Sequence, residues 1–353
     1  MQTSNIKAET TGYDAKYDII KFVLSLFVLA IHTVVYPFVL YPWLRIAVPL
    51  FFMMSSYFCF SKLKSEPADR HGKVLKKFAL RNIKLYVSWF ILLLPFTLYL
   101  RRSEYFSQGI WQGIESFIKG LFFGSTFVAS WFITATIFGV LIIYYLSKWF
   151  KKKWIILSIS AFIFGLVTLQ SSYVSCIQET ALLSAIHVVS RGLGGFVCSF
   201  PAAILWIFIG KCFAEAKSKG LPLWLLAVVL TLSCVGLYAE WRFVISLDGS
   251  YNNDSYFMLL PVCCALFAII QRIPAIHWKP SAYLKHASTI IYVSHGSFIP
   301  FCSFFLKKVL GFTTPVLDFC LTLICTLTLT VCIEFIGRKY SGKKLGKYIK
   351  WLC

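Results

Sequence analysis

Acidic residues are scarce in this chain, and charge in general is scarce. Only 14% of the 353 residues are Asp, Glu, Lys or Arg, whereas 58% are hydrophobic and 18% are aromatic. An average soluble domain has about a quarter of its residues charged, so this composition excludes an ordinary soluble globular protein. The sequence predicts an integral membrane protein that crosses the bilayer several times.

The chain also lacks the patterns that bind metals or build disulfide frameworks. No CxxC pair and no His/Cys cluster has the spacing of a zinc site, so we predict no metal. Most of the 12 cysteines lie within apolar runs, where they behave as small buried hydrophobic side chains. A cleavable signal peptide is missing as well, because no small-residue cleavage site follows a short apolar core. We therefore expect the first apolar segment to remain as a span.

Apolar runs of about 20 residues, the length that crosses a bilayer as a helix, divide the chain into ten candidate spans. They lie near residues 18–38, 44–61, 82–100, 130–147, 154–170, 195–213, 222–239, 256–271, 287–306 and 314–336. We find no internal repeat and no soluble segment of useful size. The sequence therefore predicts an all-α polytopic bundle that forms a single domain over residues 1–353.

Basic residues alternate between the segments that connect these spans. The net charge of +21 comes mainly from clusters at 62–77, 148–153, 211–219, 272–285 and 338–350. Loops rich in Lys and Arg stay in the cytoplasm, so the alternation predicts cytoplasmic tails at 1–16 and 338–353. The same alternation accounts for the positive charge, because basic loops orient the protein in the lipid bilayer. We therefore expect no nucleic acid partner.

The first predicted span carries ionisable residues that insertion into a membrane does not require. In YDIIKFVLSLFVLAIHTV these are Asp18, Lys21 and His32. At roughly 100° per residue, Lys21 and His32 lie within about 20° of one helical direction and about 16 Å apart along the axis. Ionisable side chains inside a span usually face the bundle interior or a watery cavity. This polar stripe is therefore a candidate site, running from one membrane surface to about mid-bilayer.

A second polar feature, KVLKKFALRNIKLY, leads into the third span. Lys73 and Lys76 fit a basic anchor that touches anionic lipid head groups. Arg81 and Lys84 lie where the apolar run already begins. A buried basic pair needs an anionic partner, and a phosphate-bearing cofactor is one solution.

A third feature, LKHASTIIYVSHGSFIP, places His295 within the ninth span. It is either a structural histidine bonded across helices or a member of the site. The predicted outer loops hold aromatic residues and carboxylates, including Tyr173, Glu240 and Asp254. Such a mixture is able to hold a sugar, although an interfacial aromatic belt with solvated charges is the commoner explanation.

In order and spacing, these segments resemble the type 3 membrane acyltransferases, ten-helix bacterial proteins that O-acetylate surface glycans and other extracytoplasmic acceptors. The resemblance covers about residues 13–340. Besides the polar stripe of the first span, it is carried by RIAVPLFFMMSSYF, ALRNIKLYVSWFILLLP, SWFITATIFGVLIIYYL, CSFPAAILWIFIGKCF and LKHASTIIYVSHGSF. It implies a protein of the bacterial cytoplasmic or inner membrane that moves an acetyl group from cytoplasmic acetyl-CoA to a surface polysaccharide or a lipid-linked sugar.

The resemblance also implies roles for individual basic residues. The family's basic residue followed by ten residues and a histidine matches Lys21 and His32, and its paired arginines at the third span match Arg81 and Lys84. Lys21 and Lys84 replace the commoner arginine, which changes any bidentate contact with a phosphate. Lys21, Arg81 and Lys84 are thus expected to bind the phosphates of acetyl-CoA.

Other positions bear on the acceptor and on the packing. Arg191 falls where family members often have a basic residue near the outer site, and a helix-end arginine that reaches the interface is the alternative. Ser55 and Ser56 stand where a Ser-Gly pair is usual, which predicts a looser approach of helices there. Trp131 and His295 are candidate donors to the acyl oxyanion or contacts of the substrate, as are the two serines.

Transfer from a thioester to a hydroxyl needs a base, and a histidine that titrates near neutral pH suits this role. We therefore predict His32 as the catalytic base, with a nucleophilic acyl-imidazole as the open alternative. We group Asp18 with it as the residue that fixes or neutralises Lys21. The extended pantetheine arm would then run along the helix from Lys21 towards His32.

Three other functions compete with this one. A polar stripe of Asp, Lys and His is also able to relay protons or bind a solute in a transporter, although we see no inverted repeat. The chain is also comparable to the membrane half of a serine-supplying resistance protein whose second half is a racemase. A flippase or ligase for lipid-linked sugars is the third, and it lacks the expected long periplasmic loop and arginine array.

Overall fold

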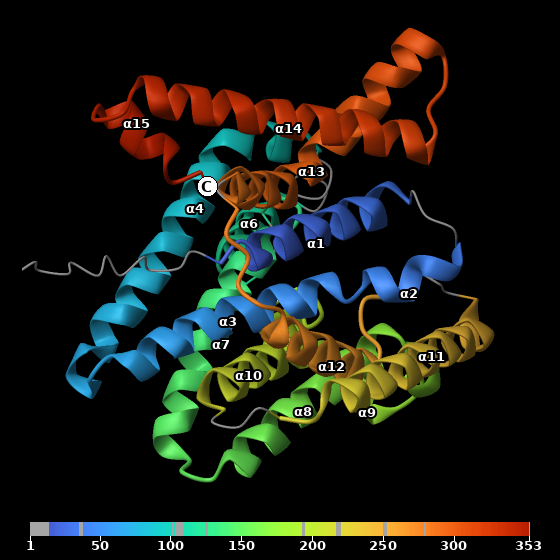
Figure 1. Ribbon diagram of the computed structural model, residues 1–353. Helices are drawn as coiled ribbons and strands as arrows, with labels where there is room; N and C mark the ends of the chain where they lie inside the picture. Colours follow the sequence, from blue (N-terminus) through green and yellow to red (C-terminus); the bar gives the residue numbers. More distant parts are fainter. Residues whose placement is uncertain are drawn as a thin grey trace, which may run out of the picture.

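The computed structural model describes residues 14–34, 38–100, 102, 109–123, 126–192, 195–216, 220–249, 253–278 and 280–352. All regular secondary structure in these residues is helical, which confirms the predicted all-α class. Figure 1 shows the helices as a bundle in which α1 lies between α3 and the pair α13 and α14.

The helices follow one another along the chain with short connections. They are α1 (Lys16–Thr33), α2 (Tyr41–Leu44), α3 (Ala47–Ser65), α4 (His71–Leu100), α6 (Ile110–Phe122), α7 (Ser130–Trp149), α8 (Lys153–Ser171), α9 (Ala181–Gly192), α10 (Pro201–Glu215), α11 (Leu223–Asp248), α12 (Leu259–Arg272), α13 (Ser281–Leu310), α14 (Pro315–Lys339) and α15 (Lys344–Ile349).

Seven helical segments in the described residues are long and apolar enough to cross a membrane: Tyr41–Ser65, Ala68–Leu100, Ser130–Trp149, Lys153–Ser171, Leu223–Leu247, Ser281–Leu310 and Pro315–Lys339. The other predicted spans coincide with α1, α10 and α12, which are shorter or more polar helices. The number of ten spans and the cytoplasmic position of both tails stay predictions.

The first helix ends earlier than the sequence predicts. α1 stops at Thr33 because Val34 adopts a left-handed conformation (φ 56°) and its amide donates to the Ala30 carbonyl. His32 consequently lies in the last turn of its helix. The polar stripe therefore runs along the whole of α1 and reaches its far end.

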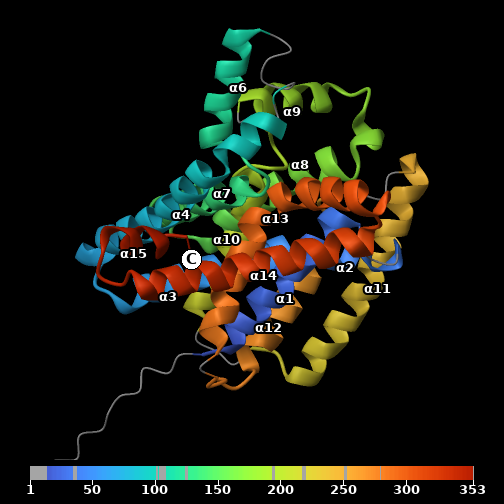
Figure 2. The ribbon, with the colours of Figure 1, turned by 90° about the horizontal axis from the view of Figure 1, so that it is seen from above.

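Two amphipathic helices occupy segments that the sequence predicts as loops. In α6, Ile110 and Trp111 are 70% and 80% exposed, and Ile114 and Ile118 continue the exposed apolar stripe. α9 carries Arg191 in its last turn. Both helices lie at one edge of the bundle (Figure 2). Each is too short for a search for spans, and for that reason the hydropathy pattern did not reveal them.

Helix α3 packs against α10 at the centre of the molecule, and the two backbones come very close. A Cβ atom at Gly210 would overlap the Ser56 hydroxyl and the Met53 carbonyl. The sequence predicted a looser approach at Ser55 and Ser56 because glycine is missing there. That prediction was wrong, since the glycine is supplied by the opposite helix.

Candidate functional site

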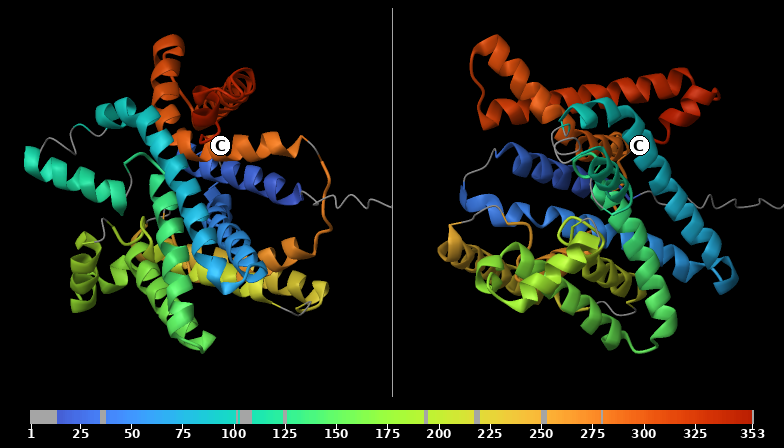
Figure 3. Two further views of the ribbon diagram at one scale, coloured as in Figure 1. Left: turned by 90° about the vertical axis from the view of Figure 1, so that its left-hand side faces the viewer. Right: turned by 180° about the vertical axis from the view of Figure 1, so that it is seen from behind.

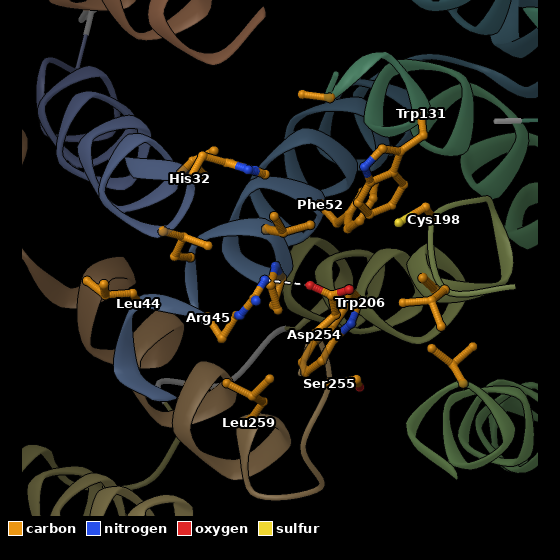
Figure 4. A pocket seen from close by; sticks show the side chains of 18 of the residues that line it. His32, Leu44, Arg45, Phe52, Trp131, Cys198, Trp206, Asp254, Ser255 and Leu259 are labelled. Atoms are coloured by element: carbon orange, nitrogen blue, oxygen red, sulfur yellow. Dashed lines mark hydrogen bonds and ion pairs between the residues drawn. The ribbon is translucent and has the colours of Figure 1, made fainter. Parts of the chain in front are cut away.

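A cavity of about 470 Å³ lies at one end of the bundle. Its walls come from the last turns of α1 and α8, from the segments that begin α3, α7, α10 and α12, and from the middle of α13. In the topology predicted from the loops, all these helix ends face away from the cytoplasm. Figure 4 shows the side chains that surround the cavity.

His32 lies in the wall of this cavity, where α1 ends. Its ring centroid is 4.8 Å from that of His295, and the two ring planes are tilted by 38°. The contact forms because α1 and α13 pack side by side. The structure therefore brings together two histidines that are 263 positions apart in the sequence.

His295 is fully buried behind His32. Its Nδ1 lies 3.1 Å from the Ile291 carbonyl oxygen, and since a carbonyl only accepts, Nδ1 carries the proton and donates. Nε2 is then an acceptor, and it has no hydrogen-bond partner in the described part of the chain. A buried acceptor of this kind is costly unless a donor satisfies it, and the neighbouring ring of His32 is able to supply one.

An ion pair forms another part of the cavity wall. Arg45 Nη1 lies 2.5 Å from Asp254 Oδ1, and Figure 4 marks the contact with a dashed line. The Arg45 guanidinium also lies over the Tyr41 ring, 4.6 Å from its centroid. The Tyr41 hydroxyl donates to the Asn253 carbonyl, and the Asp254 amide donates to the Ser171 hydroxyl. Both charged residues are thus held on fixed backbone.

Most of the remaining wall is aromatic or aliphatic. The aromatic residues are Phe52, Trp131, Phe164, Trp206 and Tyr292. Trp131 was predicted as a substrate contact, and it does line the cavity. In the turn before it, Ala129 adopts a left-handed conformation (φ 69°), which is uncommon for a residue with a Cβ. Such a conformation persists only where the surrounding structure stabilises it.

A second polar cluster occupies the other end of α1. Asp18 is buried there, at 5% exposure. The Lys21 ammonium lies over the Phe58 ring, 5.3 Å from its centroid. Asp18, Arg81 and Lys285 all lie within electrostatic range of Lys21. The structure therefore gathers three of the residues predicted for this end of the site, and it adds Lys285 from α13.

Lys84 has a different neighbour. Its ammonium lies 4.8 Å from the centroid of the Trp351 ring. The segment around Trp351 is attached to α4, because the Trp89 indole nitrogen donates to the Leu352 carbonyl and the Tyr348 hydroxyl donates to the Ser88 carbonyl. Figure 3 shows the end of the chain beside α4. Aromatic residues of the C-terminal segment thus lie against α4, where Trp351 contacts Lys84.

Two further predicted residues lie away from the cavity. Arg191 is exposed near the end of α9 and does not line the cavity in the described structure. Ser56 is fully buried and donates to the Met53 carbonyl at 3.0 Å, which is a packing role between α3 and α10. The structure does not bring either residue to His32.

Sequence reasoning missed Arg45 as a member of the site. It stands at the start of an apolar run, on the side where the predicted loops are poor in Lys and Arg. A lone arginine at the outer end of a span is the signal that was available. Asp254 was noted only as one of several outer carboxylates.

Comparison with known proteins places this geometry in context. The profile of a family described as an acyltransferase domain, acyltransferase 3, matches residues 14–335. An "Amino-acid racemase" of Enterococcus faecalis is 24% identical over 349 residues, covering 93% of this chain and 47% of that protein. A "Serine/alanine racemase" of Enterococcus gallinarum is 23% identical over 301 residues, covering 84% and 41%. The chain thus spans less than half the length of these relatives. No solved structure matches.

Proposed function

The chain belongs to the acyltransferase 3 family, and on that premise we propose that it is an O-acetyltransferase of the bacterial cytoplasmic or inner membrane. It takes an acetyl group from cytoplasmic acetyl-CoA and transfers it to a hydroxyl of an extracytoplasmic glycan, such as a capsular, cell-wall or other surface polysaccharide. The family and the apolar helices establish the coarser description, a membrane acyltransferase. We propose in addition the acetyl-CoA donor, the glycan acceptor and the bacterial membrane.

Helix α1 joins the two polar regions, and this arrangement is the main support for the proposed function. Lys21 lies in the basic cluster near the start of α1, and His32 lies in the cavity at its end. The eleven residues between them correspond to a rise of about 16 Å along the helix. An extended pantetheine arm is able to span that distance, with the phosphates of acetyl-CoA at Lys21 and Arg81 and the thioester near His32.

The chemistry follows from the two histidines. His32 accepts the proton of the acceptor hydroxyl as the oxygen attacks the thioester carbonyl. The carbon–sulfur bond breaks when the tetrahedral intermediate collapses, and the thiolate of CoA takes up a proton. In the reacting complex, His295 Nε2 would accept a hydrogen bond from the other ring nitrogen of His32, which would hold the unprotonated nitrogen towards the cavity. An acyl-imidazole intermediate on His32 is the alternative route.

Acyl transfer with the purified protein tests the proposal directly. Labelled acetyl-CoA is supplied with a panel of capsule and cell-wall glycans, and wild type is compared with His32→Ala. We expect the wild type to label a glycan and the variant to lose transfer while it still binds acetyl-CoA. A wild type that neither binds nor consumes acetyl-CoA would refute the function.

The basic cluster has its own test. Lys21→Ala should raise the KM for acetyl-CoA by about tenfold or more, because a charge-assisted contact with a phosphate is lost. Lys73→Ala is the matched control, since Lys73 is an exposed lysine at the start of α4. Equal KM values for the two variants would remove Lys21 from the donor site.

The racemase relatives favour a second candidate. The alignments cover most of this chain but less than half of each racemase. The chain would then be a membrane domain that serves amino-acid metabolism, with the cavity binding or conducting a small solute. Uptake of labelled serine and alanine into proteoliposomes distinguishes the two, because an acetyltransferase is expected to show no uptake above that of empty vesicles.

A further inference from the structure

We propose that Arg45 and Asp254 form a subsite for an uncharged sugar ring of the acceptor. The guanidinium donates to one ring oxygen or hydroxyl, the carboxylate accepts from a neighbouring hydroxyl, and the aromatic wall packs against the face of the ring. This inference names the class of acceptor and rests on the proposed function for the statement that the acceptor is a glycan.

The first support is the charge of the cavity. Arg45 and Asp254 form an ion pair, so their charges cancel within one wall. An anionic acceptor would have to displace Asp254 from Arg45 or lie beside that carboxylate as a second negative charge, and either arrangement costs electrostatic and desolvation energy. A neutral ligand with hydroxyl groups leaves the pair intact. The electrostatics therefore favour an uncharged acceptor over an acidic one.

The second support is the unused hydrogen-bonding capacity at the cavity surface. The Asp254 side chain is 49% exposed, and only its Oδ1 contacts Arg45. Its Oδ2 lies outside that contact and is able to accept from a hydroxyl of a ligand. The Arg45 side chain is only 13% exposed, so the guanidinium is fixed in place before any ligand arrives. Side chains fixed in advance lose little entropy when they bind a ligand.

The third support is the aromatic wall. Phe52, Trp131, Trp206 and Tyr292 line the cavity that holds the ion pair. Trp131 and Phe52 pack together with ring centroids 6.0 Å apart. A sugar ring presents a face of C–H bonds that suits an aromatic surface, while its hydroxyls point outward from the ring edge to polar groups. The indole rings therefore suit the face of a sugar ring, and the ion pair suits the hydroxyl groups at its edge.

The subsite is also close to the catalytic base. Arg45 and His32 line the same cavity, as Figure 4 shows. A cavity of about 470 Å³ falls within the usual range for sites that enclose small ligands. A sugar bound at Arg45 and Asp254 therefore presents its other hydroxyls to His32.

The test uses the full chain in nanodiscs and pairs of oligosaccharides that differ only in a carboxylate. The pairs are glucose with glucuronate, galactose with galacturonate and mannose with mannuronate trimers. Binding is followed by tryptophan fluorescence without acetyl-CoA, and transfer is followed separately with labelled acetyl-CoA. We expect the wild type to bind and acetylate a neutral trimer in preference to its acidic counterpart.

Substitutions then assign the preference to the ion pair. Asp254→Asn removes the negative charge beside Arg45, so the ratio of neutral to acidic binding should fall by about tenfold or more. Arg45→Gln should weaken neutral binding without any gain for the acid. Glu115→Gln makes the same change of charge in an exposed pair with Lys119 on α6, and it should leave the ratio unchanged. Thermal unfolding checks that each variant is folded.

The outcomes separate this inference from the proposed function. Preference of the wild type for acidic trimers, absence of binding for every pair, or equal ratios in wild type and folded Asp254→Asn would each overturn the subsite. Transfer of acetyl groups that is unaffected by either substitution would do the same and would leave the acetyltransferase standing. Neutral binding that depends on Asp254, together with no acetyl transfer to any acceptor, would support the subsite and refute the function.

Discussion

At the scale of single residues, His295 is the side chain whose role the structure changes most. The sequence suggested a substrate contact or a structural histidine. The structure places it wholly behind His32, with Nδ1 donating to the Ile291 carbonyl. Its unpartnered acceptor adjoins the ring of His32, so on the proposed function His295 would orient the base.

A pair of substitutions at His295 tests this role. In glutamine, the side-chain amide oxygen lies about as far from the backbone as the Nε2 atom of a histidine. In the shorter asparagine, it lies only about as far as Nδ1. We expect His295→Asn to lower kcat by about 10- to 100-fold, as is typical when the group that orients a catalytic or metal-bound histidine is lost. His295→Gln should keep most of kcat, and neither change should alter the KM for acetyl-CoA.

Comparison of the two variants excludes a purely structural role. Both replace a buried ring by a smaller amide, so both should lower thermal stability to a similar degree. Equal losses of kcat in the two variants would mean that His295 acts only by packing. Acyl transfer rates and thermal unfolding of the same preparations supply the answer.

Residues that share one helix are the ones whose arrangement helical spacing predicts from the sequence. Asp18, Lys21 and His32 share a face of α1 because helical spacing alone places them there. Arg45 and Asp254 meet across 209 positions, through the packing of helices that no local pattern encodes. The sequence therefore does not predict that these two residues form a pair.

At the scale of helices, the close contact of α3 with α10 depends on Gly210. A Cβ there would overlap the Ser56 side chain and the Met53 carbonyl, and backbone atoms do not move aside cheaply. Gly210→Ala should therefore destabilise the protein by about 1–3 kcal/mol, the usual cost of overpacking. Thermal unfolding in detergent measures the loss.

Gly165 is the matched control for that substitution. It lies in the middle of α8, and a Cβ there would meet no atom within 4 Å. Gly165→Ala should leave stability unchanged or raise it by up to about 1 kcal/mol, because alanine favours the helix. A similar destabilisation by both substitutions would contradict the tight contact at Gly210.

A second helix-level feature lies at the end of α10, beyond the predicted span. Glu215 binds Lys211 of its own helix at 2.7 Å and Lys153 at the start of α8 at 2.9 Å. Burial acts to raise the pKa of Glu215, but the hydrogen bonds and charges of the two lysines outweigh it and hold the pKa below its ordinary 4.5. The ionised carboxylate therefore ties the two helices together.

The sign of this shift predicts how stability depends on pH. A carboxylate whose pKa is lowered by folding stabilises the protein above its ordinary pKa of 4.5, and the contribution is lost as the pH falls through the folded value. Glu215→Gln should thus lower the thermal unfolding temperature at neutral pH and reduce its decline below about pH 4.5. Glu115→Gln should change neither, because its exposed pair contributes little.

At the scale of the whole molecule, the sequence predicted the helical bundle well and the periphery poorly. Long apolar runs identify helices such as α7, α13 and α14 because the bilayer sets their length. The short amphipathic helices α6 and α9 escape that criterion, and so does the early end of α1 at Thr33. The cavity itself arises from the joint arrangement of several helix ends, which a single chain pattern does not contain.

The positions of the basic cluster and the cavity at opposite ends of α1 predict which side of the membrane each one faces. On the proposed function, acetyl-CoA would reach Lys21 from the cytoplasm, and the glycan would reach His32 from the other side. In a cysteine-free background, Lys151→Cys reports the predicted cytoplasmic loop between α7 and α8. Trp111→Cys reports α6, in the segment predicted to lie outside, where the native side chain is 80% exposed.

A membrane-impermeant maleimide added to intact cells, with the outer membrane permeabilised where one is present, should label Trp111→Cys and spare Lys151→Cys. Inverted vesicles should give the reverse pattern. The expected contrast follows from the basic clusters, since loops rich in Lys and Arg resist translocation. Labelling of both positions from one side would place the basic cluster and the cavity in a different relation to the bilayer. A donor site and an acceptor site on opposite faces would then be impossible, and the single helix that connects them would need another explanation.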